Sequence, residues 1–517
     1  MILTHRPAGR RDLIFALLTA LFSILCTNFY LWGDCGMAAG AATVLLCLTA
    51  VLYLRPHRQK VTAYGLFCLL AYLAGAGSLA VSDDAATKAL VIFSLLLLSG
   101  LIYLELMGLR AKAYDRPTYC AETRAPVGDL IFAYFILPFS TIGSTCYAIF
   151  HRADGQGGVR GRRTGSALLG LACALPVLMV VIPLLMSSDA AFEGLLGRLD
   201  LDTVVEIAVS ILLGLFVFLL AFGRMFHARD YVAPQKAAPS DRGLEPVALC
   251  SFLGVLSAVY VVYLITQLAY FFSAFEGLLP KDFTVAQYAR RGFFEMATIC
   301  AINLVLIFVA NLISRKQAGK APLLLRLLSV FICVFSLVLI ATALSKMCLY
   351  IGSFGLTRQR ILTSVFMVFL GILFLAVIAR MFWKKVPCLK IAVVAGALLL
   401  IATCYADVDR IVAGYNVRAY QSGRLETIDL AHLDSLNSAA AVPYLFELLE
   451  AEDAQVAAEA LDTLEEHFSD FYWLTWDEGG NPVLEPREAA TDWRAFNLAT
   501  LRARDLLWEH RALFLTE

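Results

Sequence analysis

Long apolar runs constrain this chain more than any other feature of its sequence. A bilayer core about 30 Å thick is crossed by about 20 residues of helix, which satisfies its backbone polar groups internally. Eleven runs are long enough, at 12–32, 36–54, 61–81, 88–108, 166–186, 203–224, 246–273, 294–313, 323–345, 361–382 and 388–405. Only 16% of the 517 residues are charged, against about a quarter in soluble proteins. The sequence therefore predicts an all-α fold, a polytopic transmembrane helical bundle of about 11 spans.

A further apolar stretch, residues 126–150, is ambiguous. It contains Asp129, Pro138 and Gly143, and arginines flank it on both sides. If it crossed the membrane, one of the two basic flanks would be translocated, against the positive-inside tendency. We therefore predict a re-entrant or interfacial segment whose two ends both lie in the cytoplasm.

The distribution of Lys and Arg sets the predicted orientation. With eleven spans and a cytoplasmic N-terminus, most basic loops lie in the cytoplasm, and the 33–36, 82–84 and 187–202 loops lie outside. Two outer junctions are basic exceptions, at 281–291 and 346–360. The same orientation places the C-terminal part of the chain outside the cytoplasm.

The C-terminal part differs from the rest of the chain in charge. Residues 406–517 contain 22 Asp and Glu, 8 Arg and no Lys, a formal net charge of −14, and the rest of the chain carries +14. Such a division indicates parts that lie in different solvents. We predict four regions: a four-span region at 1–125, the re-entrant segment and a cytoplasmic loop at 126–165, a seven-span core at 166–405, and an acidic extracytoplasmic helical domain at 406–517.

Apolar residues three and four positions apart predict helices in this small C-terminal domain. The predicted helices are Asp407–Tyr420, Ser438–Leu449, Ala454–Phe468 and Asp492–Phe514. The second and third together resemble one HEAT-type repeat. An irregular segment is predicted between the last two helices, marked by Trp473, Trp476, Gly479, Gly480 and Pro482.

The junction at 279–295 packs charged and aromatic residues between two apolar runs. Thr284, followed three residues later by Gln287, is typical of a capping box and predicts a helix that begins there and continues to about Ala310. Guanidinium groups are costly in hydrocarbon, so we expect this helix to begin among the lipid headgroups.

In this topology three groups of polar residues lie at the extracytoplasmic ends of predicted spans, where they could converge on one outer vestibule. The candidate residues are Tyr288, Arg290, Arg291, Glu295, Lys346, Tyr350, Arg358, Arg360, Asp407, Asp409, Tyr415 and Asn416. Basic and aromatic residues at span ends commonly anchor a helix at the interface. The favoured interpretation is therefore that these residues anchor the helices and dock the C-terminal domain 406–517, which we call the tail, through ion pairs with Asp407 or Asp409. An anion-binding or headgroup-binding pocket, and a role in catalysis or ion coupling, are the alternatives.

Motifs that would indicate a reaction are missing from the sequence. The 13 cysteines form no Cys-x-x-Cys pair, and the 7 histidines avoid the apolar runs, so we expect no metal site and no catalytic constellation. The sequence has no phosphate-binding loop and no nucleophile elbow, and we expect no cofactor. The basic loops have the character of topology determinants, so a nucleic-acid partner is not expected, and the sequence does not identify a small-molecule ligand.

A set of short motifs is distributed over the second half of the chain, at Leu279-Pro280, 288–295, Asn303, 345–347, Leu349-Tyr350, 354–358, Arg360-Ile361, Asp409, 415–417, Trp493, 496–498 and Arg504. These motifs resemble an uncharacterised bacterial membrane family, the domain of unknown function 4173, and its relative 4153. The chain departs from the family pattern at Ala406-Asp407 and Gly414. The resemblance implies a multi-pass protein of the bacterial plasma membrane and implies no known activity.

These observations favour a non-enzymatic envelope protein for sensing or interaction. It would present an acidic helical domain outside, with the lipid bilayer and a protein partner as its contacts. A transporter or lipid flippase with an outer vestibule is one alternative, and an intramembrane transferase acting on a lipid-linked substrate is another. Only Glu295 is a candidate base for the transferase.

Overall fold

The computed structural model divides the chain into two compact units. It describes residues 8–54, 62–81, 83–106, 137–150, 201–228, 245–275, 293–313, 323–383, 385–430, 433, 439–476, 482–487 and 492–515. Unit 1 comprises Met1–Ala111, Val127–Ala233 and Phe468–Glu517, and unit 2 comprises Lys112–Pro126 and Pro234–His467.

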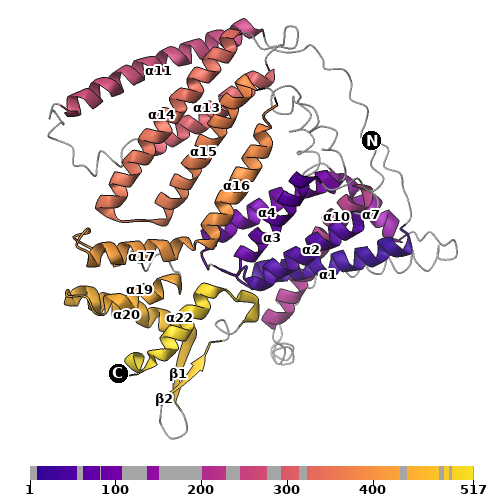
Figure 1. Ribbon diagram of the computed structural model, residues 1–517. Coiled ribbons are helices and arrows are strands. Elements are labelled where there is room, and N and C mark those ends of the chain that lie inside the picture. The colour runs from indigo at the N-terminus through magenta and orange to yellow at the C-terminus, as the bar shows by residue number, and fades with distance from the viewer. Residues whose placement is uncertain are drawn as a thin grey trace, which may run out of the picture. The chain divides into compact units, whose positions relative to one another are not determined.

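Unit 1 is built on a layer of apolar helices. They are α1 (Arg10–Trp32), α2 (Met37–Leu54), α3 (Ala63–Ser78), α4 (Ala85–Leu106), α7 (Leu137–Phe150) and α10 (Leu201–Ala228). α1 packs against α2 and α10, α3 packs against α2 and α4, and α7 packs on α10 (Figure 1). Small residues allow the close approach: a Cβ added at Gly214 of α10 would lie 2.5 Å from the Cα of Ile24 in α1.

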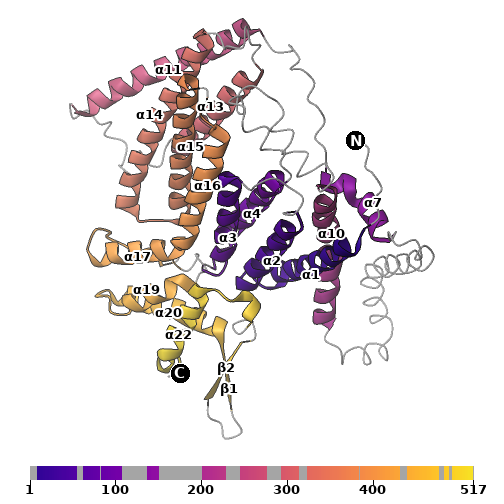
Figure 2. The same ribbon diagram turned by 45° about the vertical axis from the view of Figure 1, so that its right-hand side comes forward.

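The C-terminal residues of unit 1 form a hairpin and a helix. β1 (Tyr472–Trp476) pairs antiparallel with β2 (Pro482–Pro486), with Leu474 opposite Leu484. The chain continues through η4 (Trp493–Ala495), α22 (Leu498–Glu509) and η5 (Arg511–Phe514). The hairpin lies beside α22 in both views (Figures 1 and 2), where the rings of Tyr472 and Trp508 are 5.3 Å apart.

Unit 2 has a bundle of long helices and a cap of short ones. Its long helices are α11 (Pro246–Phe275), α13 (Phe293–Ile313), α14 (Leu323–Phe354), α15 (Arg358–Phe382) and α16 (Cys388–Tyr405). The short elements are α17 (Val408–Gln421), η3 (Ala439–Ala441) and α19 (Val442–Leu448), followed by α20 (Ala454–Phe471), which extends into unit 1 by four residues. α14 packs against α11, α13 and α15, and α16 packs against α15.

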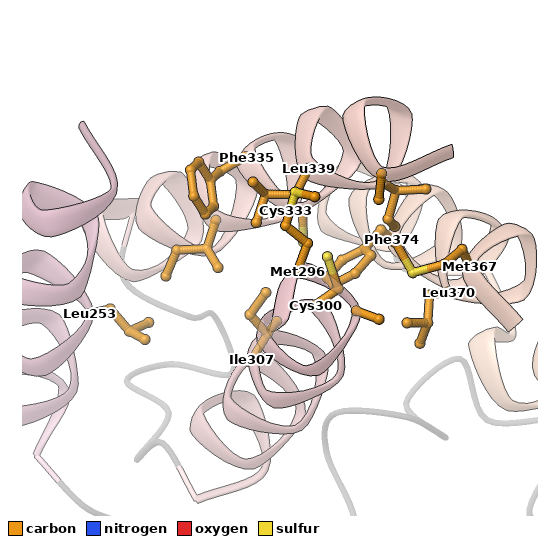
Figure 3. Packing of buried hydrophobic residues seen from close by; sticks show 14 of the residues in the cluster. Leu253, Met296, Cys300, Ile307, Cys333, Phe335, Leu339, Met367, Leu370 and Phe374 are labelled. Carbon is orange, nitrogen blue, oxygen red and sulfur yellow. The ribbon is translucent and has the colours of Figure 1, made fainter. Parts of the chain in front are cut away.

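The core of unit 2 is apolar with one satisfied polar network. Met296, Cys333 and Phe374 are among the buried residues that α13, α14 and α15 contribute to it (Figure 3). Inside it, the Tyr260 hydroxyl donates to Asn303 Oδ1 at 2.6 Å, and Asn303 Nδ2 donates to Ser336 Oγ at 3.0 Å. Amides that bond between helices in this way stabilise membrane bundles.

The predicted helical membrane bundle is confirmed. Helices occupy ten of the eleven predicted apolar runs, and the remaining one, 166–186, lies outside the described residues. Eight described helices are long and apolar enough to cross a membrane, and shorter apolar helices cover Ala63–Ser78 and Glu295–Asn311. The number of spans, the re-entrant character of 126–150 and the four region boundaries stay predictions.

The C-terminal predictions were partly wrong. α17, α19 and α20 lie where helices were expected, but within the segment predicted to be irregular Tyr472–Trp476 and Pro482–Pro486 form paired antiparallel strands. The reason is that aromatic and β-branched residues at 472–476 and Val483 favour paired strands. The predicted helix Asp492–Phe514 is also interrupted, because Asn497 caps α22 by accepting a hydrogen bond from the Thr500 N–H at 2.9 Å.

Candidate functional site

Five of the predicted polar residues gather at a tight turn between α14 and α15. Residues 355–357 connect these two helices, and we call them the Gly355 turn. Gly355 has φ +74°, and a Cβ added there would lie 2.6 Å from Asn416 Oδ1. Both the left-handed conformation and the close approach require glycine at this position.

Asn416 of α17 clamps this turn with its side-chain amide. Its Oδ1 accepts a hydrogen bond from the Leu356 N–H at 2.7 Å, and its Nδ2 donates to the Leu356 carbonyl at 2.8 Å. Asn416 and Leu356 are both buried, at 8% relative exposure each. Leu356 lies outside any helix, so its buried N–H and carbonyl have no helical partners. The Asn416 amide satisfies both groups instead.

A bidentate ion pair lies beside the clamp. Arg358, the first residue of α15, donates from Nε to Asp409 Oδ1 at 2.8 Å and from Nη2 to Asp409 Oδ2 at 2.7 Å. The Asp409 side chain is fully buried, and the Arg358 side chain is 24% exposed. Asp409 belongs to the first turn of α17, where the helix dipole also favours a negative charge.

Arg360 also contacts the Gly355 turn, through its backbone carbonyls. Its guanidinium lies 4.2 Å from the centroid of the Tyr350 ring and donates to the carbonyls of Phe354, at 3.0 Å, and Gly355. The Arg360 N–H in turn donates to Thr357 Oγ1 at 3.3 Å, which caps α15. α17 lies crosswise to α15 and α16 at this end of the bundle (Figures 1 and 2).

The structure brings together five of the twelve predicted site residues: Tyr350, Arg358, Arg360, Asp409 and Asn416. Asp407 is the N-cap residue of α17 with φ 54°, and Lys346 lies one turn before Tyr350 on α14. Tyr415 is instead associated with Arg424, whose guanidinium is 5.9 Å from its ring centroid. Glu295 is exposed in the first turn of α13.

The remaining predicted residues are Tyr288, Arg290 and Arg291, and they lie outside the described residues. The same holds for the capping box at Thr284 and Gln287. The described helix α13 begins at Phe293 and continues past Ala310 to Ile313.

Gly414 lies at the contact between α17 and α19. A Cβ added at Gly414 would lie 2.9 Å from two ring atoms of Tyr444, so the two helices meet there without room for a side chain.

We expect Gly414→Ala to lower the free energy of unfolding of the tail by about 1–3 kcal/mol, the usual cost of overpacking a filled contact. Denaturant unfolding followed by the fluorescence of an added probe on α19 would measure it. Gly352→Ala is the matched control, because nothing lies within 4 Å of a Cβ there. Equal stability of Gly414→Ala and the wild type would contradict the packing described here.

A second polar cluster in unit 1 was missed by sequence reasoning. Arg494 of η4 forms ion pairs with Glu206 of α10 and with Asp492, and its Nε lies 2.8 Å from Asp492 Oδ2. Asn28 of α1 donates from Nδ2 to Glu206 Oε1 at 2.9 Å and to Ser210 Oγ at 3.1 Å. The pKa of Arg494 is raised: burial alone would lower it, but the hydrogen bonds and charges of Asp492 and Glu206 outweigh burial.

Backbone hydrogen bonds fix the same segment to two loops of unit 1. The Met37 N–H donates to the Phe496 carbonyl at 2.9 Å, and the Leu498 N–H donates to the Ala80 carbonyl at 2.9 Å. Trp493 meets Phe29 edge-on, with centroids 5.5 Å apart. Residues 492–499 therefore lie on the same side of the membrane helices as the 33–36 and 79–81 loops.

Arg494→Gln should weaken this attachment by about 1–2 kcal/mol, because two partly exposed carboxylates lose a charged donor. Hydrogen exchange at the Met37 and Leu498 amides should accelerate about tenfold in consequence. Arg502→Gln removes the same charge from an exposed position of α22 and should leave both amides unchanged. Unchanged exchange in Arg494→Gln would show that the ion pairs do not hold the segment.

Both clusters consist of ion pairs and hydrogen bonds that attach a C-terminal segment to the end of an apolar helix. Their charged groups bond to one another or to backbone carbonyls, and they connect an extramembrane segment to the end of a membrane helix. Among the residues that the structure describes, no group of three or more His, Cys, Asp or Glu could hold a metal ion.

The fold defines a multi-pass helical membrane protein. The family model of the domain of unknown function DUF4153 matches residues 40–448. Because this match covers most of the chain, the chain belongs to the DUF4153 family. No curated protein and no solved structure matches the chain significantly.

Proposed function

We propose that this chain is a non-enzymatic interaction protein of the bacterial envelope, spanning the plasma membrane and presenting its acidic tail outside the cytoplasm. The observation that carries the proposal is the attachment of α17 to the Gly355 turn by the Arg358–Asp409 pair and the Asn416 amide. These contacts use the polar groups of the predicted site for holding the tail. The suggested relation to the domain of unknown function 4173 is part of this proposal.

Two observations support the proposed orientation. Within unit 1, residues 492–499 are bonded to Met37 and to residues 80–81, which adjoin the 33–36 and 82–84 loops that the charge distribution assigns to the outside. Within unit 2, α17 is bonded to the turn that joins α14 and α15, so both lie at the same end of that bundle. A cytoplasmic N-terminus and an extracytoplasmic tail satisfy both relations.

The exposed face of α20 is the surface we expect a protein partner to contact. Ala460 and Leu464 are fully buried, whereas Glu459, Asp462, Glu466 and Asp470 are exposed and follow one another at helical spacing. The helix contains no Lys or Arg. A row of carboxylates complements the charge of a basic partner and attracts it electrostatically. Salt screens this attraction and shortens its range.

Photo-crosslinking from position 466 in intact cells tests this proposal. We expect one predominant adduct with an extracytoplasmic protein, which weakens at high salt and when Glu459, Asp462 and Asp470 are replaced by Gln or Asn. Neutralising Glu447, Glu450 and Glu452 instead removes three tail charges away from α20 and is the control. Adducts with cytoplasmic proteins only, or adducts insensitive to charge, would contradict the proposal.

A further inference from the structure

The end of α14 presents a mixed cationic and apolar face. Lys346, Leu349, Tyr350, Ser353 and Phe354 recur three and four residues apart and therefore share one side of the helix. Leu349 is 55% exposed and Phe354 is 50% exposed. Because α14 is long and apolar enough to cross a membrane, these two side chains at its end would meet the boundary between lipid headgroups and acyl chains.

Arg360 adds a positive charge to this face from the start of α15. Its guanidinium lies over the Tyr350 ring and donates to the carbonyls of Phe354 and Gly355. None of the described residues places a carboxylate against Arg360, in contrast to Arg358, which Asp409 neutralises. A guanidinium at the edge of the hydrocarbon with neutral partners keeps its full charge, and an anion there is strongly favoured.

We propose that Arg360 and the Lys346–Phe354 face of α14 bind the phosphate of an anionic phospholipid in the leaflet that meets the Gly355 turn. The guanidinium offers planar paired donors that match phosphate oxygens. Lys346, one turn further into the membrane, reaches the headgroup by extending its flexible stem toward water. Leu349 and Phe354 lie beside the acyl chains, which is why the proposed ligand is a lipid and not free phosphate.

Native mass spectrometry of the full-length protein in neutral detergent would measure this binding. The probes are phosphatidylglycerol, phosphatidylcholine and inorganic phosphate. We expect the wild type to prefer phosphatidylglycerol to phosphatidylcholine, and Arg360→Gln to bind phosphatidylglycerol about tenfold more weakly, the effect of losing one charged hydrogen bond. Arg360→Lys should recover part of the loss, and Lys346→Gln should lower the affinity by a smaller factor.

Arg511→Gln is the matched control. Arg511 also stacks on an aromatic ring, 4.8 Å from the centroid of Trp508, but it lies in the C-terminal η5 outside the membrane helices. Equal binding of phosphatidylglycerol by wild type, Arg360→Gln and Lys346→Gln would overturn the proposal. Displacement of the lipid by inorganic phosphate at equal concentration would overturn the lipid assignment. If Arg360→Gln does not fold, the comparison of Lys346→Gln with Arg511→Gln decides.

Discussion

Arg358→Gln is expected to lower the free energy of unfolding of unit 2 by about 3–5 kcal/mol, because it leaves a buried carboxylate without its cation. Asp409 is fully buried and cannot turn to water, whereas Arg358 is 24% exposed. Asp409→Asn should therefore cost less, about 2 kcal/mol, since the arginine that remains can be hydrated. Unfolding of the purified protein in mixed micelles, followed by circular dichroism, would measure both values.

Two further variants separate the ion pair from general damage at this end of the bundle. Arg410→Gln removes an exposed arginine next to Asp409 and should change stability by less than about 0.5 kcal/mol. The double variant Arg358→Met/Asp409→Leu removes both charges together and should recover much of the loss, because an apolar pair of similar volume needs no compensation. A double variant as unstable as Arg358→Gln would show that the pair is not the origin of the effect.

Asn416→Ala is expected to have the second largest effect, a loss of about 2–4 kcal/mol. Two hydrogen bonds disappear, and the buried N–H and carbonyl of Leu356 are left without the amide that satisfies them. The Gly355 turn should also become mobile, so hydrogen exchange at the Leu356 amide should accelerate by at least about tenfold.

Asn311→Ala is a suitable control for Asn416→Ala. Asn311 donates from Nδ2 to the Ile307 carbonyl at 2.8 Å within its own helix, and that carbonyl keeps its helical partner without it. We expect a change below about 1 kcal/mol. Equal decreases in the free energy of unfolding of the two variants would mean that the Asn416 hydrogen bonds to Leu356 do not stabilise the turn more than an ordinary side-chain hydrogen bond within a helix.

The membrane helices were predictable because hydrocarbon imposes one solution on a long apolar run. Only a helix satisfies its own backbone there, so the predicted run 388–405 and helix α16 (Cys388–Tyr405) coincide. The same reasoning fails for Tyr472–Trp476, whose aromatic residues suit several structures and whose strand conformation depends on pairing with Pro482–Pro486.

The candidate site was predictable in part for a different reason. Charges at helix ends stand out in an apolar sequence, so Arg358 and Asp409 were both among the candidate residues, and docking through Asp407 or Asp409 was predicted without its cationic partner. The Arg494–Glu206 pair joins residues 288 positions apart, and no periodic pattern reports such a contact. Glu206 stands out in the sequence as a charge at the start of an apolar run, and Trp493 as an aromatic residue near the end of the chain. No pattern in the sequence near either residue indicates that the two segments meet.

Each attachment is made within one unit. In unit 2 the first tail helix is held to the α14–α15 turn, and in unit 1 residues 492–499 are held beside two interhelical loops. In each unit, bonded contacts therefore connect a part of the tail to helix ends.

The central claim is that the tail lies outside the cytoplasm and is fixed to the membrane helices by the Arg358–Asp409 pair. Treatment of intact bacterial spheroplasts with a non-specific protease, followed by sequencing of the cleavage sites, tests it most directly. We predict cleavage within residues 406–517 from the outside, slow in the wild type and at least about tenfold faster in Arg358→Gln. Equal rates in the two proteins would contradict the attachment, and protection of the tail until the cells are lysed would contradict the orientation.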